Sequence, residues 1–136
     1  MDASICVMFP AERYKGTNFE QASLQVKFVD AKTPGSCSKP GPDVWPEGIS
    51  ATEPTRLING VRFAHSRIGA GAMSHELENN VYRAFKNGTC YEVSVKVTFT
   101  NFQVYEPGTI KDFTKGDYKR VVQDLMQVLD SFKILR

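Results

Sequence analysis

Alternating apolar and polar residues predict β-strands near the start of the chain. Over residues 22–28 the apolar Leu24, Val26 and Phe28 alternate with polar residues, which is the period of a strand that buries one face. The run 5–9 is apolar throughout and predicts a core strand. Two strands are therefore expected before the first long loop.

Two Asn-Gly pairs predict tight hairpin turns, because a type I′ turn needs positive φ at both central residues. Asn59-Gly60 lies within 55–63 and predicts a short hairpin, whereas Asn87-Gly88 joins two longer runs, 77–86 and 89–101. Counting outward from the second turn predicts the pairs Lys86–Thr89, Ala84–Tyr91, Tyr82–Val93 and Asn80–Val95. This register places a largely apolar set on one face of the sheet.

One amphipathic helix is predicted at the end of the chain. Thr114 and Asp117 have the spacing of a capping box, with aspartate in place of glutamate. The apolar residues that follow share one helical face: Val121, Val122, Leu125, Val128, Leu129 and Phe132. The fold class predicted is α+β, an antiparallel β-sheet meander with a C-terminal amphipathic helix packed on it.

Residues 31–54 predict a long Pro/Gly-rich loop, because five of the seven prolines fall there and no regular period survives. A loop of this length usually has a function or a covalent fastening. Trp45, the only tryptophan, is expected to pin the loop to the body of the domain. The alternative is that its ring stacks on a ligand.

Composition predicts one globular domain over residues 1–136. The formal charge is +2 and no run of basic residues occurs, so we expect no nucleic-acid partner and no anionic membrane surface. No apolar stretch reaches the roughly 18 residues of a membrane helix, so no integral membrane segment is expected. Since 5–9 already predicts a core strand, we expect a natural N-terminal segment to be missing.

Three cysteines, Cys6, Cys37 and Cys90, allow three single disulfides. Local context favours Cys37–Cys90, because Cys37 lies in the long loop and Cys90 begins a strand beside a tight turn. Cys6 is expected to pack as a free thiol in its apolar strand. A disulfide indicates an oxidising compartment. The alternative is a cytosolic protein with three buried, reduced cysteines.

A series of different short motifs runs through most of the chain: Tyr14–Phe19 with Ala22-Ser23, Ile58–Val61, Gly69–Ala72, Glu78, Tyr82-Arg83, Asn87–Tyr91, Thr100-Asn101, Pro107–Thr109 and Ser131–Lys133. Together they resemble a group of uncharacterised bacterial envelope proteins. The resemblance implies a secreted, periplasmic or envelope domain, exported or lipid-anchored behind a signal segment, with its two-cysteine pattern at Cys37 and Cys90. Ser131–Lys133 also resembles the end of PsbP-like domains. The chain departs from the group at Phe102–Tyr105 and in the extra Cys6.

The glycine-rich stretch 69–73 does not fit a dinucleotide loop, because it leads into a strand and not into a helix. Gly69 and Gly71 are expected to permit a tight passage or a close backbone approach, with the lining of a ligand cleft as the alternative. Arg83 lies opposite Glu92 in the predicted register. We interpret the two as a cross-strand ion pair, with anion binding as the alternative.

His75 and Glu76 resemble the start of a zinc-binding helix, but the segment alternates like a strand and the residue four positions on is Asn79. No second ligand follows at the required spacing. His65 is the only other histidine, so a metal site would need separate segments to meet. We therefore expect no metal, no cofactor and no catalytic residue.

The pattern favours a non-catalytic domain that binds a protein or a small-molecule ligand. One alternative is a small hydrolase-like enzyme that uses His75, Glu76 or Glu78, and Asp43 beside the glycine-rich stretch. Another is a structural module that associates with itself. The residues expected to contact a ligand or partner are Trp45, Gly69, Gly71, His75, Glu78, Tyr82 and Arg83.

Overall fold

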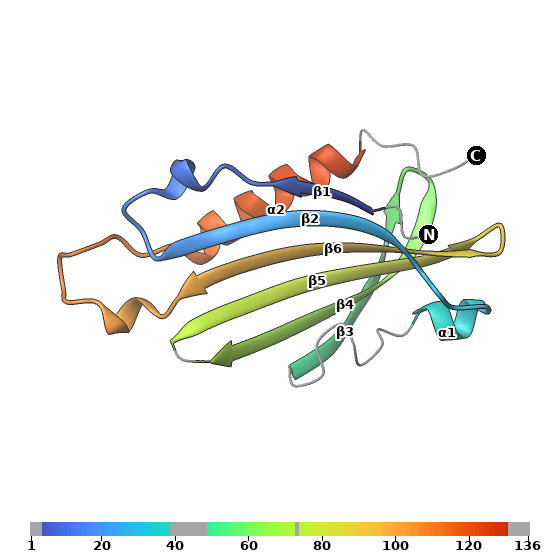
Figure 1. Cartoon of the computed structure of the whole chain (residues 1–136), viewed down its shortest axis with the longest axis horizontal. Coiled ribbons are helices and arrows are strands. Elements are labelled where there is room, and N and C mark those ends of the chain that lie inside the picture. The colour runs from blue at the N-terminus through green and yellow to red at the C-terminus, as the bar shows by residue number, and fades with distance from the viewer. Residues whose placement is uncertain (1–3, 39–48, 73, 131–136) are drawn as a thin grey trace.

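The α+β fold is confirmed by the computed structural model, which describes residues 4–38, 49–72 and 74–130. In that part of the chain an antiparallel sheet carries the C-terminal helix on one face (Figure 1). The strands are β1 (Ser4–Met8), β2 (Phe19–Val29), β3 (Ile49–Ile58), β4 (Val61–Ala72), β5 (His75–Lys86) and β6 (Thr89–Thr100). The helices are α1 (Pro34–Ser38) and α2 (Lys115–Asp130), with short 3-10 turns η1 (Ala11–Tyr14) and η2 (Phe102–Val104).

The spatial order of the strands is β1-β2-β6-β5-β4-β3. Strands β3 to β6 form the predicted meander, and β2 lies on the far side of β6. Every predicted pair of the β5–β6 hairpin is confirmed: Lys86–Thr89, Ala84–Tyr91, Tyr82–Val93, Asn80–Val95 and Arg83–Glu92. Both Asn-Gly turns have positive φ at their two residues, as the type I′ turn requires.

The predicted loop over 31–54 contains two elements that the sequence pattern did not indicate. Helix α1 occupies its first part, and β3 already begins at Ile49. Strand β3 has no alternating pattern of its own here, but it pairs with β4 along its length. Pro54 lies where the β3–β4 register shifts, at the kind of irregularity that tolerates a residue without a backbone N–H. Trp45 and Asp43 lie outside the described residues.

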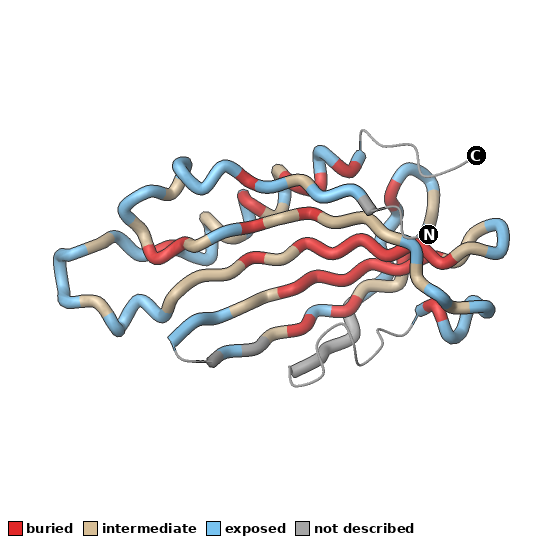
Figure 2. The backbone as a smooth tube through the Cα atoms, viewed as in Figure 1, coloured by how far each residue is buried: buried red, intermediate tan, exposed pale blue. Residues whose placement is uncertain are grey.

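The main core lies between the sheet and α2. Figure 2 shows buried positions running along the central strands. The sheet contributes Leu24, Phe63, Tyr82, Ala84, Val93, Val95 and Val97, and the helix contributes Val121, Leu125, Met126 and Leu129. Of the predicted helical face, Val128 is exposed and Phe132 lies outside the described residues. Neither helix in the described part of the chain is long and apolar enough to cross a membrane.

The start of α2 is held by a capping box and by a backbone hydrogen bond just before it. The predicted capping box is confirmed, because the Asp117 N–H donates to Thr114 Oγ1 at 3.1 Å and the Thr114 N–H donates to Asp117 Oδ2 at 3.0 Å. Just before the cap, the Phe113 N–H donates to the buried Asn18 side chain at 2.6 Å. An aromatic cluster surrounds this point, with ring centroids 4.9 to 6.1 Å apart: Phe9, Tyr14, Phe19, Phe99 and Phe113.

The Cys37–Cys90 disulfide is confirmed, and it ties α1 to the start of β6. The expectation that Cys6 packs inside the protein is wrong, since its thiol is free and exposed. Strand β1 is at the edge of the sheet, and Val7 is the residue that points to the α2 side, opposite Leu24. Cys6 therefore points to the other face.

Candidate functional site

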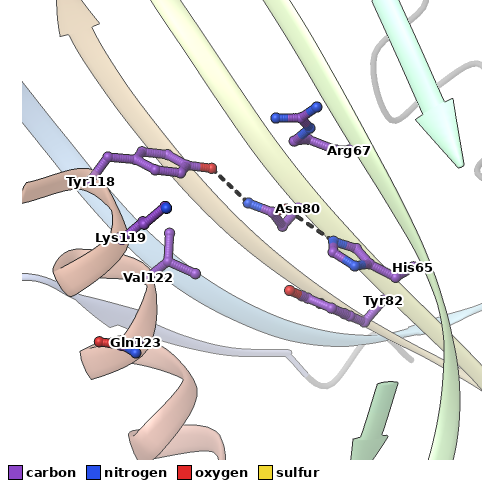
Figure 3. A pocket seen from close by; sticks show the side chains of 8 residues that line it. All are labelled: His65, Arg67, Asn80, Tyr82, Tyr118, Lys119, Val122 and Gln123. Atoms are coloured by element: carbon purple, nitrogen blue, oxygen red, sulfur yellow. Dashed lines mark hydrogen bonds between the residues drawn. The ribbon is translucent and has the colours of Figure 1, made fainter. Parts of the chain in front are cut away.

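An open cleft of about 430 Å³ lies beside α2, over strands β4 and β5 (Figure 3). We call it the α2 cleft. Its lining consists of His65, Arg67, Asn80, Tyr82, Tyr118, Lys119, Val122 and Gln123. The first four come from the sheet and the last four from the helix, so the cleft exists only in the folded domain.

The position of α2 on the sheet creates this cleft. The helix packs mainly on β2 and β6, so the outer strands on the same face are only partly covered. In the β4–β5 register His65 lies opposite Tyr82 and Arg67 lies opposite Asn80. Alternation along each strand therefore turns all four side chains toward the helix side.

A hydrogen-bond chain crosses the floor of the cleft. Asn80 Nδ2 donates to the Tyr118 hydroxyl at 2.9 Å, and Asn80 Oδ1 lies 2.9 Å from His65 Nε2. Because Oδ1 can only accept, the proton of a neutral His65 ring is on Nε2. Its Nδ1 is then an acceptor. The His65 ring also stacks on the Tyr82 ring, with the two centroids 4.2 Å apart and an interplanar angle of 23°.

Tyr118 remains protonated across the physiological range. Burial of the phenol, followed by the charge of the Glu78 carboxylate, raises its pKa from 10.0 to about 12. The hydrogen bond from Asn80 and the charge of Arg67 oppose this rise only in part. The phenol also donates a hydrogen bond to the Glu78 side chain, so it is neutral and a poor candidate for a general base.

The charge of the lining has one sign. Two of the eight lining residues, Arg67 and Lys119, are cationic, and none of the eight is acidic. Glu78 lies close enough to influence Tyr118, but it is not part of the lining. In the described part of the chain Lys119 forms no ion pair.

Two sequence-predicted contact residues belong to this region. Tyr82 lines the cleft, although its ring is almost fully buried and forms the floor beneath His65. Glu78 is not part of the lining, but its carboxylate acts on Tyr118 through its charge and through a side-chain hydrogen bond. Trp45 lies outside the described residues.

The residues of the hydrolase alternative are not brought together. His75 and Glu78 are odd and even positions of one strand, so they point to opposite faces of the sheet. His75 is exposed, and its Nδ1 lies 2.9 Å from Glu20 Oε1. Glu76 points to the same side as Glu78, and Asp43 lies outside the described residues. Within the described ranges no three metal-ligating side chains gather in one place.

Gly69 and Gly71 lie inside β4, opposite Glu78 and Glu76. Neither has a positive φ. A Cβ built at Gly69 would meet no atom closer than 4.0 Å, and at Gly71 none closer than 3.5 Å. The expected tight passage is therefore wrong, because both distances are ordinary van der Waals contacts. Neither glycine lines the α2 cleft.

Arg83 is inside the protein, on the face opposite to the cleft. Its Nε donates to Glu92 Oε2 at 2.8 Å and its Nη2 donates to the same oxygen at 2.5 Å. The two side chains are 5% and 2% exposed. The ion-pair interpretation is confirmed, and its burial makes Arg83 a structural residue of the sheet.

Sequence reasoning missed four central residues of the cleft: His65, Asn80, Tyr118 and Lys119. One signal was present, because Asn80 is a polar residue among Ala84, Tyr82, Tyr91, Val93 and Val95 on the largely apolar face of the predicted hairpin. A buried polar side chain needs a hydrogen-bond partner. Its partners come from β4 and α2, which the sequence did not place beside it.

Comparison with protein-family models, with curated proteins and with solved structures finds no match to this chain. The resemblance to bacterial envelope proteins and to PsbP-like domains therefore stays a hypothesis.

Proposed function

We propose that this chain is a non-catalytic binding domain that takes a small molecule into the α2 cleft. The observation that carries the proposal is the cleft itself, whose volume of about 430 Å³ lies in the usual range of small-molecule sites. Such sites combine an apolar surface with a few polar groups in fixed positions. Here Val122 and the His65 ring, which stacks on Tyr82, supply the apolar surface, and the hydrogen bonds from Tyr118 through Asn80 to His65 fix the polar groups.

The hydrogen-bond series Tyr118–Asn80–His65 favours binding over catalysis. A catalytic histidine is commonly oriented by a carboxylate, which stabilises the imidazolium that forms when the ring takes a proton. The partner of His65 is instead the neutral amide of Asn80. These hydrogen bonds therefore fix the orientation of donors and acceptors without stabilising a transferred proton.

The disulfide supports a location outside the reducing cytosol. We propose a secreted domain or a domain of the bacterial cell envelope, which is also what the sequence resemblance implies. Expression with and without export to the periplasm tests this. If the protein accumulates equally well folded in a reducing cytosol, with Cys37 and Cys90 both free to react, the assignment is wrong.

A fragment screen followed by proton–nitrogen correlation NMR tests the binding function. We expect the amide signals that shift to belong to the cleft segments around residues 65–67, 80–82 and 118–123. Val122→Trp, which fills the cleft without adding charge, should abolish these shifts. The matched control is Val128→Trp on the exposed side of the same helix. Shifts that are scattered over the surface, or equal losses in both variants, would contradict the proposal.

A further inference from the structure

We infer that the occupant of the α2 cleft is an amphipathic organic anion, with its oxyanion at Lys119 and its apolar part against Val122 and the His65 ring. This inference rests on the proposed function and adds the chemical class of the ligand. It follows from three properties of the lining: its charge, the placement of its donors and the position of its apolar surface.

The charge of the lining favours an anion. Arg67 and Lys119 stand on opposite sides of the Tyr118–Asn80 hydrogen bond, and no acidic residue lines the cleft (Figure 3). The ammonium of Lys119 forms no ion pair in the described part of the chain. Glu78 lies outside the lining, where its carboxylate accepts a hydrogen bond from the Tyr118 hydroxyl. A cleft walled by one sign of charge raises the local concentration of the opposite ion.

The donors stand together at the rim on the helix. Lys119 and Gln123 are four residues apart in α2, so they are neighbours on one face of the helix. Both can donate hydrogen bonds to a single oxyanion, and a bond to a charged acceptor is stronger than one between neutral groups. Tyr118, one residue before Lys119, keeps its proton and donates it to Glu78, so it adds no negative charge to the cleft.

The apolar surface lies between the rim and the floor. Val122 is partly buried against the core and also lines the cleft. Below it the His65 ring, stacked on the buried Tyr82 ring, provides a flat surface. A ligand that carried charge alone would leave this surface wet. The lining therefore fits a molecule with an apolar body, such as an aromatic carboxylate, sulfonate or phosphate ester.

Two fluorescent dyes with the same ring system test this inference. Anilinonaphthalene sulfonate is an aromatic anion, and phenylnaphthylamine is its neutral counterpart. We expect the anionic dye to bind the folded protein more tightly than the neutral one. Lys119→Gln should weaken binding of the anionic dye about tenfold, as the loss of one charge-assisted contact predicts, and leave the neutral dye within about twofold. The control is Lys115→Gln, one turn earlier on the same helix and outside the cleft.

Each outcome separates the two proposals. If both dyes bind with equal affinity and both are displaced by Val122→Trp, the cleft binds small molecules without selecting anions, and the inference is overturned while the proposed function stands. If Lys115→Gln weakens the anionic dye as much as Lys119→Gln, the selectivity comes from the general field of the helix and the inference also fails. If Val122→Trp changes the binding of neither dye, the proposed function fails with it. Competition of the anionic dye with benzoate and with phenyl phosphate then distinguishes a carboxylate site from a phosphate site.

Discussion

Replacing Arg83 by methionine should destabilise the protein strongly, because it leaves a buried carboxylate without its main partner. Glu92 is 1% exposed, and both hydrogen bonds to its Oε2 come from Arg83. Its Oε1 keeps the Ser94 hydroxyl at 3.2 Å and the Lys27 ammonium at 3.5 Å. Breaking a buried ion pair from one side costs about 3–5 kcal/mol. Since Lys27 remains on one oxygen, we expect a loss near the lower end, about 3 kcal/mol.

The double replacement Arg83→Met with Glu92→Met should recover most of that loss. Apolar side chains of similar volume avoid the desolvation of both charges, and such exchanges are often neutral or stabilising. Lys27 can then turn its ammonium to solvent, because its side chain is already 37% exposed. We expect the double variant to be at least about 2 kcal/mol more stable than Arg83→Met alone.

Urea unfolding followed by circular dichroism measures both effects, with the slope of the transition checked for equality among variants. Arg62→Met is the matched control. Arg62 is exposed, and its Nη1 donates to Thr55 Oγ1 at 2.9 Å, so its loss should change the unfolding free energy by less than about 0.5 kcal/mol. The reasoning is refuted if Arg83→Met costs no more than this control, or if the double variant is no more stable than the single one.

Three further predictions concern the disulfide, the helix cap and the cleft. Replacing Cys37 and Cys90 by alanine should lower the unfolding free energy by up to about 4 kcal/mol, as expected for a cross-link between residues 53 apart. In the unreduced parent protein, alkylation followed by mass spectrometry should label Cys6 alone. Labelling of all three thiols would contradict the pairing. Thr114→Ala removes the side-chain acceptor of the α2 cap and should cost about 1 kcal/mol in the same urea assay, whereas an unchanged midpoint would show that the cap contributes nothing. The pKa of Tyr118 is raised from 10.0 to about 12, so the folded state holds the phenol proton more tightly than the unfolded chain, and the resulting stabilisation is complete below pH 10.0 and is lost as the pH approaches about 12. Tyr118→Phe should therefore flatten the fall in unfolding free energy over that pH window. An identical fall in both proteins would disprove the shift.

Local patterns in the sequence predicted the parts of the fold that short-range chemistry determines. The Asn87-Gly88 turn fixed the register of β5 and β6, and alternation then assigned their faces. The Thr114–Asp117 spacing located the start of α2. The first half of strand β3 escaped prediction because it has no alternation and is followed at once by Pro54. Its conformation comes from pairing with β4, which is a tertiary effect that no local window contains.

The cleft could be predicted only in fragments, because it depends on two relationships between distant segments. The β4–β5 register brings His65 beside Asn80, and the packing of α2 on β2 and β6 leaves room for Tyr118 above them. Neither relationship has a signature in the sequence. Tyr82 was identified because it lies in the hairpin whose register could be counted. Cys6 was misjudged because an apolar run does not reveal that its strand is at the edge of the sheet.

The strand order also determines the sequence of events by which the chain assembles. Strands β3 to β6 are joined by successive turns, so each pairing closes a short loop at little entropic cost. Strand β2 instead pairs with β6, and strands β3, β4 and β5 lie between the two in the sequence. Such a non-local pairing slows folding. A nascent chain therefore carries β1 and β2 as an isolated ribbon, which has marginal stability by itself. We therefore expect β1 and β2 to become stable last, when β6 and α2 have been synthesised and can pair and pack with them.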